Sequence, residues 1–264
     1  MVAPCIIIDS FQTDYDPALL KTLALGVVVE LVFFFLYAMI AKLFFRKEEP
    51  NVKLPFRFGS MYGNTGFMGL PLIQAILGND ALIFAVVALM VYNLVMWTHG
   101  YMMMSGSAKG FSIKNAVLNP GVLAVAAGLP LFLTHTTLPG PLHSAVSFLG
   151  SMNTPLAMVV IGAQMARADL KTTLRDKKLY EGAFVKLLLI PLFTAAALLP
   201  LRSNVLLYTA TVILAATPSA GSTSMFAERF DRSPERAAQL VSLTTLLSIA
   251  TLPVMAVLAE TLAG

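Results

Sequence analysis

The sequence predicts an all-α, polytopic membrane protein, because it has few charges and its apolar residues are gathered in long blocks. Of its 264 residues, 57% are hydrophobic and 12% are charged. Soluble domains carry about 25% charged residues, and a membrane-crossing helix needs about 20 mostly apolar ones. A half-helix and about eight full spans are therefore expected, the spans at residues 18–45, 55–78, 80–105, 114–134, 141–166, 178–201, 203–229 and 234–262.

The basic residues support these spans, because they are concentrated in every second connection. Four connections hold most of the Lys and Arg, namely Arg46, Lys47, Lys53 and Arg57; Lys109 and Lys114; Arg167, Lys171, Arg175, Lys177 and Lys178; and Arg229, Arg232 and Arg236. Cytoplasmic loops are enriched in Lys and Arg. We therefore predict a multi-pass protein of the cell (inner) membrane with an extracytoplasmic C-terminus.

The order of features also predicts an internal repeat. Met1-Val2-Ala3-Pro4 aligns with Met152-Asn153-Thr154-Pro155, and the spans that follow each segment correspond in order. Units of five helices would have opposite orientations, as in many secondary transporters. We expect residues 1–108 to form an incomplete first repeat and residues 109–264 a complete second one. In this reading the first helix and half of the second are absent from the chain.

The span at 55–78 contains residues that a continuous helix tolerates poorly. It reads Gly63-Asn64-Thr65-Gly66-Phe67-Met68-Gly69-Leu70-Pro71. Proline lacks an amide donor, and glycine costs about 1 kcal/mol relative to alanine inside a helix. Pro71 suits the first turn of a new half-helix. We therefore predict that this helix is broken near the membrane centre.

The span at 203–229 contains a matching cluster, Thr217-Pro218-Ser219-Ala220-Gly221-Ser222-Thr223-Ser224. Two half-helix N-termini would then face the membrane centre, each with a partial positive charge. Such ends suit a carboxylate. The predicted binding residues are Asn64, Thr65, Gly66, Gly69, Pro71, Pro218, Ser219, Ser222 and Thr223. The alternative is that both clusters only allow close helix packing or a kink.

Three further positions are considered at the expected site. Asn153 and Pro155 either line it or simply bend their helix. Glu30 lies in mid-span, where a charge is costly, so it either couples transport to protons or makes a neutral helix contact. Lys186 also lies in a span, and we expect its long stem to reach the cytoplasmic surface.

The residues of both clusters resemble the auxin efflux carrier family of membrane transporters. The run Asn64-Thr65-Gly66-Phe67-Met68-Gly69-Leu70-Pro71 resembles that family's signature, and Pro218-Ser219-Ala220 with Ala227-Glu228-Arg229 resembles its second crossover. Asn115, Pro120, Gly128 and Pro155 also fit. The resemblance implies ten helices in two inverted repeats, crossing broken helices, and transport of organic anions such as auxin, malonate or malate. It also places Asn64, Pro71 and Pro218 at the core of the site. Ser222 stands where many members have asparagine.

These observations favour a secondary transporter, or permease, for a small carboxylate. No Gly-x-x-x-x-Gly-Lys-Ser/Thr loop is present, and Cys5 and the three histidines have no catalytic or ligand spacing. We therefore expect no enzyme activity, no catalytic or metal-binding residues, no cofactor and no nucleic-acid partner. The expected partners are the organic anion, the bilayer and a second copy in a homodimer. A non-transporting receptor or an inactive truncated fragment remains the alternative.

Overall fold

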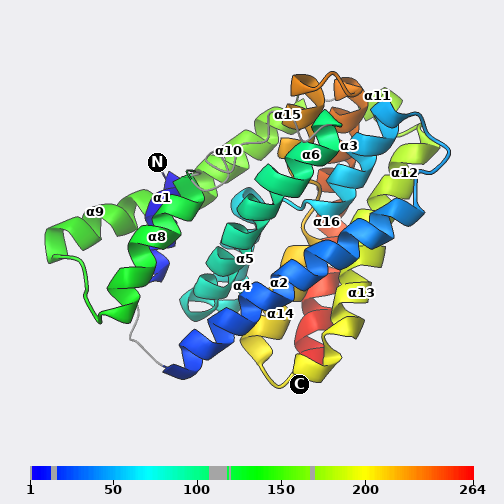
Figure 1. Cartoon of the computed structure of the whole chain (residues 1–264). Coiled ribbons are helices and arrows are strands. Elements are labelled where there is room, and N and C mark those ends of the chain that lie inside the picture. The colour runs from blue at the N-terminus through cyan, green and yellow to red at the C-terminus, as the bar shows by residue number, and fades with distance from the viewer. Residues whose placement is uncertain (1, 13–16, 107–117, 119, 167–169) are drawn as a thin grey trace.

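The computed structural model describes residues 2–12, 17–106, 118, 120–166 and 170–264, and these residues form a helical bundle without strands (Figure 1). The first half contains α1 (Val2–Ser10), α2 (Pro17–Leu43), α3 (Pro50–Met61), η1 (Thr65–Gly69), α4 (Leu70–Leu77), η2 (Asn79–Ala81), α5 (Leu82–Val95), η3 (Met96–Gly100) and α6 (Tyr101–Ser105).

The second half contains α8 (Pro120–Leu133), α9 (Gly140–Ser151), α10 (Asn153–Ala166), α11 (Leu170–Thr173), α12 (Lys177–Phe184), η4 (Val185–Leu189), α13 (Ile190–Ala197), η5 (Leu199–Leu201), α14 (Val205–Ala216), α15 (Ser222–Arg229) and α16 (Pro234–Ala263). The segments η1, η3 and η4 are π-helical turns that continue directly into the next helix. The prediction of an all-α protein is confirmed.

Four helices in the described part of the chain are long and apolar enough to cross a membrane, at Ala18–Leu43, Asn79–Ser105, Lys177–Ala197 and Pro234–Ala263. The other four expected spans are not described as single continuous helices. The segments 55–78 and 203–229 are each interrupted near the middle, and 141–166 is interrupted at Met152. Much of the start of the expected 114–134 span lies outside the described residues, and the described helix there is α8, with 14 residues.

The helices form two groups. α1 packs against α8 and α9, and Figure 1 shows these helices side by side at one edge of the molecule. The larger group is built from α2 to α6 and α12 to α16, with α14 packed on α16 and α2 packed on α5. The helix α5 contacts both groups.

The outer faces of the helices are apolar, as lipid contact requires. On α2 the exposed side chains include Val28, Leu31, Val32, Phe35, Met39 and Leu43. Phe148 on α9 and Ile249 on α16 are 70% and 69% exposed. A water-soluble protein rarely presents apolar surface of this extent, whereas lipid tails are as apolar as these side chains.

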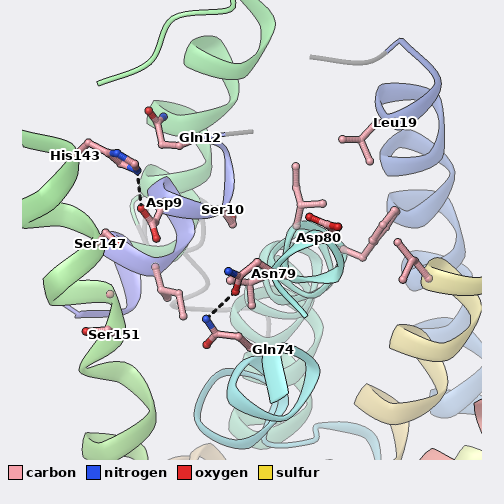
Figure 2. A pocket seen from close by; sticks show the side chains of 16 residues that line it. Asp9, Ser10, Gln12, Leu19, Gln74, Asn79, Asp80, His143, Ser147 and Ser151 are labelled. Atoms are coloured by element: carbon pink, nitrogen blue, oxygen red, sulfur yellow. Dashed lines mark hydrogen bonds and ion pairs between the residues drawn. The ribbon is translucent and has the colours of Figure 1, made fainter. Parts of the chain in front are cut away.

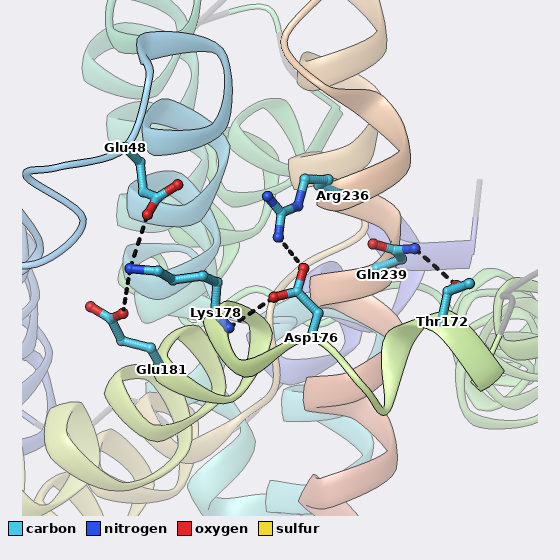
Figure 3. A network of polar contacts seen from close by, with 7 residues as sticks. All are labelled: Glu48, Thr172, Asp176, Lys178, Glu181, Arg236 and Gln239. Carbon is cyan, nitrogen blue, oxygen red and sulfur yellow. Dashed lines mark hydrogen bonds and ion pairs between the residues drawn. The ribbon is translucent and has the colours of Figure 1, made fainter.

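Polar contacts join the helices at the end of the bundle where the α2–α3, α11–α12 and α15–α16 connections lie, which we call the basic end (Figure 1 and Figure 3). The Lys178 ammonium lies 2.9 Å from Glu48 and 3.6 Å from Glu181, so it bridges α12 and the α2–α3 connection. Arg236 on α16 pairs with Asp176, whose carboxylate also accepts the Lys178 backbone N–H at 2.9 Å. The C-terminus lies at the opposite end of the bundle (Figure 1).

Candidate functional site

The first interruption separates α3 from the half-helix that runs through η1 and α4. α3 ends at Met61, and the Asn64 side chain caps the next helix by accepting the Phe67 backbone N–H at 3.3 Å. The half-helix therefore begins at Thr65, six residues before Pro71. Pro71 lies buried in the first turn of α4, directly after the π-helical turn Thr65–Gly69. Its missing amide explains why the α-helical pattern is not continuous here.

The second interruption separates α14 from α15. α14 ends at Ala216, the backbone of Thr217 is extended, and α15 begins at Ser222. No side-chain cap is present at the start of α15, where Gly221 occupies the cap position. The two half-helices thus differ, because an amide side chain caps only the first of them.

The two interruptions cross and are paired through their backbones. Gly63 and Ser219 form an isolated antiparallel bridge. The Asn64 N–H donates to the Pro218 carbonyl at 2.7 Å, and the Ala220 N–H donates to the Tyr62 carbonyl at 2.9 Å. These bonds satisfy buried backbone groups that the interrupted helices leave without partners of their own. We call this pairing of residues 62–64 with 218–220 the crossing.

Small residues make this close approach feasible. A β-carbon on Gly63 would lie 2.4 Å from Thr217 Oγ1 and 2.9 Å from Lys186 Nζ. The Ser219 hydroxyl donates to the Gly59 carbonyl at 2.8 Å, and its backbone N–H donates to Thr244 Oγ1 on α16 at 3.2 Å. The crossing is thereby fixed to α3 and to α16.

Polar atoms without protein partners lie on two of the predicted site residues. Thr223 Oγ1 and Asn153 Nδ2 are buried and have no hydrogen-bond partner among the described residues. Such atoms are rare in folded proteins and need an explanation such as a bound water or ligand. Asn153 is the first residue of α10, which packs against η1.

A cavity of about 20 Å³ lies beside the crossing, which is room for about one water molecule. Thr65 and Gly63 line it, together with the buried side chains of Glu30 and Lys186. The expectation that Lys186 reaches the cytoplasmic surface was wrong. Its side chain is 1% exposed, and the ammonium donates to the Ala215 carbonyl at 3.0 Å.

The structure does not bring every predicted site residue into the crossing. Pro155 is exposed on α10, three residues after the interruption at Met152. Gly69 packs against Leu214 of α14, and a β-carbon there would lie 2.6 Å from that side chain. Gly66 is partly exposed beside Leu89.

Two tyrosines near the crossing escaped the sequence reasoning. The Tyr92 hydroxyl on α5 lies 3.1 Å from Ser222 Oγ, and the Tyr37 hydroxyl on α2 lies 2.7 Å from Thr194 Oγ1. Both tyrosines line the cavity beside the crossing. Each tyrosine places a hydroxyl in an otherwise apolar span, and a buried tyrosine usually has a polar partner. This pattern could have marked both residues in the sequence.

A cavity of about 620 Å³ lies elsewhere, between α1, α9 and the start of α5 (Figure 2). Its lining includes Asp9 and His143, whose side chains are 3.3 Å apart, and Gln74, which donates to Asn79 at 3.0 Å. None of the residues predicted for the binding site is among the residues that line it. No group of three or more metal-ligating side chains occurs in the described ranges.

Comparisons with known proteins agree on a family of membrane transporters. Residues 1–117 and 108–256 match the family described as "Membrane transport protein". The chain is 26% identical over 196 residues to a protein of Methanothermobacter thermautotrophicus named "Uncharacterized transporter", across 74% of this chain and 64% of that protein. It is also 26% identical over 219 residues to a Rhizobium meliloti protein named "Putative malonate transporter", across 79% and 68% of the two chains. The matched part thus spans about two thirds of the length of these relatives.

Proposed function

The chain belongs to the membrane transport protein family, and from this premise we propose that it is a secondary transporter for a small organic anion. The anion binds at the crossing and is carried by alternating access. The observation that supports this most directly is the pairing of two interrupted helices at Gly63 and Ser219. Non-helical backbone in mid-membrane is tolerated only where protein or a wet cavity surrounds it, and transporters use such breaks as binding sites.

The electrostatics of the crossing favour a carboxylate ligand. The helix from Thr65 and the helix from Ser222 both begin there, and helix N-termini carry about half a positive charge. Asn64 uses its side-chain oxygen in the cap, so its amide nitrogen is the group that can donate to an anion. The proposed contacts are Asn64, Thr65, Gly66, Ser219, Ser222, Thr223 and Asn153, and Gly69, Pro71, Pro218 and Pro155 shape the helices that carry them.

We further propose that residues 1–108 and 109–264 are inverted repeats. The order of long helix, interrupted helix and long helix occurs as α2, α3–α4 and α5–α6, and again as α12–α13, α14–α15 and α16. The protein would lie in the cell (inner) membrane with its basic end in the cytoplasm and its C-terminus outside. A homodimer is part of the same proposal.

Malonate is the first substrate to test, because one relative carries that name. Proteoliposomes with the purified protein should accumulate labelled malonate or malate. We expect Asn64→Ala to lower uptake about tenfold, the effect of losing one hydrogen bond to a charged group. Asn51→Ala is the matched control, because Asn51 bonds to Arg232 at the basic end, away from the crossing.

Expression and melting temperature of both variants separate a binding defect from misfolding. Unchanged uptake by Asn64→Ala would refute the role of its amide. Absence of uptake across a panel of mono- and dicarboxylates would count against the transporter itself.

A further inference from the structure

The crossing also gathers two helix ends of the opposite polarity. α3 ends at Met61 and α14 ends at Ala216, and the last carbonyls of a helix have no partners within it. These ends carry about half a negative charge each. In transporters with interrupted helices, such C-terminal ends are where a coupling cation such as Na⁺ is bound.

The two ends are satisfied in different ways here. On α3, the Gly59 carbonyl accepts the neutral Ser219 hydroxyl, and the Tyr62 carbonyl just past that helix accepts the Ala220 N–H. On α14, the Ala215 carbonyl accepts the Lys186 ammonium at 3.0 Å. A lysine therefore stands where a free cation would complete the end of the second interrupted helix.

The surroundings of Lys186 are built to hold the ammonium at this point. The side chain extends from the π-helical turn Val185–Leu189, which leads into α13 with Pro191 in its first turn. The absence of a side chain at Gly63 leaves the space that Nζ occupies. Among the described residues that line the adjoining cavity, Glu30 is the acidic one, and it forms no direct ion pair with Lys186 in the described structure.

We propose that the Lys186 ammonium is a built-in cation of the crossing, so that transport requires no alkali metal ion. It neutralises the carbonyl end of α14, and Glu30 balances its charge from across the water-sized cavity. This inference rests on the proposed transport function and specifies how the site is charged. It predicts that removing the ammonium while leaving its space creates a site for a small monovalent cation.

Two variants of Lys186 separate charge from space. Lys186→Ala removes the charge and opens a polar void at Ala215 and Glu30, whereas Lys186→Met removes the charge and fills the void. Lys42→Ala is the control, because Lys42 is an exposed lysine near the end of α2.

The first measurement is the melting temperature of the purified proteins in choline, sodium, lithium or methylammonium chloride. We expect sodium, lithium or methylammonium to stabilise Lys186→Ala, and none to change the wild type, Lys186→Met or Lys42→Ala. A wild type stabilised by sodium, or a Lys186→Ala variant that responds to none of these ions, would overturn the inference. This measurement does not depend on transport.

The second measurement is uptake of labelled malonate under the same salts. Wild-type uptake should be equal in choline and sodium, and Lys186→Ala uptake should fall about tenfold in choline and recover in sodium, lithium or methylammonium. Sodium-dependent uptake by the wild type would reject the built-in cation and leave the transporter proposal standing. If no protein transports any anion, the transporter proposal fails and the melting data still decide the role of Lys186.

Discussion

At the scale of single residues, Gly63 decides whether the two interrupted helices can meet. It pairs with Ser219, and its missing side chain leaves room for both Thr217 and the Lys186 ammonium. No other residue type offers that space. Glycine is therefore required at position 63 because the two backbones approach closely there. An unusual backbone angle is not the reason.

Gly63→Ala should destabilise the protein by about 1–3 kcal/mol, the usual cost of overpacking a buried site. The added methyl group would lie 2.4 Å from Thr217 Oγ1, and that hydroxyl is held by the Leu214 carbonyl. The melting temperature in detergent measures the effect. Gly162→Ala is the control, because none of the described atoms lies within 4 Å of a β-carbon there. Equal melting temperatures for both variants would show that the crossing is not tightly packed.

Single residues also mark where sequence reasoning was insufficient. Glycine and proline at 63–71 and 217–221 disfavour a continuous helix whatever their neighbours are. The interruptions could therefore be located without a structure. The destination of a long side chain depends on which neighbours surround it. From the sequence alone, the Lys186 side chain could extend toward the membrane surface or into the bundle. The space at Gly63 that receives its ammonium lies in a distant segment of the chain, between α3 and η1.

At the scale of elements, each helix end needs partners for its backbone groups, and the described helices obtain them in several ways. Asn64 caps the helix from Thr65, and Asp176 caps α12. At the other polarity, the Ser219 hydroxyl donates to the Gly59 carbonyl near the end of α3, and the Lys186 ammonium donates to the Ala215 carbonyl at the end of α14. Asp176 also pairs with Arg236, so one carboxylate stabilises α12 and joins it to α16 (Figure 3).

Two substitutions at Asp176 should separate these roles. Asp176→Asn keeps a good cap but loses the ion pair, and partly exposed pairs contribute about 0.2–1 kcal/mol. Asp176→Ala loses the cap as well, which costs about 1 kcal/mol more. We expect the melting temperature to fall in the order wild type, Asn, Ala, and only the first step should shrink at high salt. If both variants melt alike, the cap makes no contribution.

The interruptions of the helices were easier to predict than their ends. Clusters of polar residues and glycine predicted both interruptions. The first half-helix was predicted to begin near Pro71, whereas it begins at Thr65. The start depends on the Asn64 cap and on the backbone bond from Asn64 to Pro218. That second contact joins residues far apart in the chain, so no local pattern could reveal it.

At the scale of the whole molecule, the α2–α3, α11–α12 and α15–α16 connections lie at one end of the bundle and the C-terminus lies at the other (Figure 1). The family and the all-α class were predicted correctly from composition, block length and short motifs. The inverted repeats, the binding residues and the orientation stay predictions. The binding residues depend on contacts with a ligand, and the orientation depends on the position of the chain in a membrane. The sequence alone specifies neither.

The helix α16 offers a direct test of orientation. Its 30 residues extend about 45 Å, enough to reach both surfaces of a bilayer. In a Cys5→Ser background, Gly264→Cys should react with a membrane-impermeant maleimide on intact cells, and Glu235→Cys should react only after permeabilisation. The reverse labelling pattern would contradict the proposed topology, and labelling of both in intact cells would mean that the helix does not cross.

The antiparallel bridge between Gly63 and Ser219 has a mechanical consequence. Pulling the two interrupted helices apart would break buried backbone bonds that no solvent can replace, so they must travel together as one stiff body. Movement between the two interrupted helices is therefore disfavoured, whereas the bridge places no such restraint on the group of α1, α8 and α9. Under the proposed transport function, an anion bound at the crossing would keep its contacts with both interrupted helices as they move together.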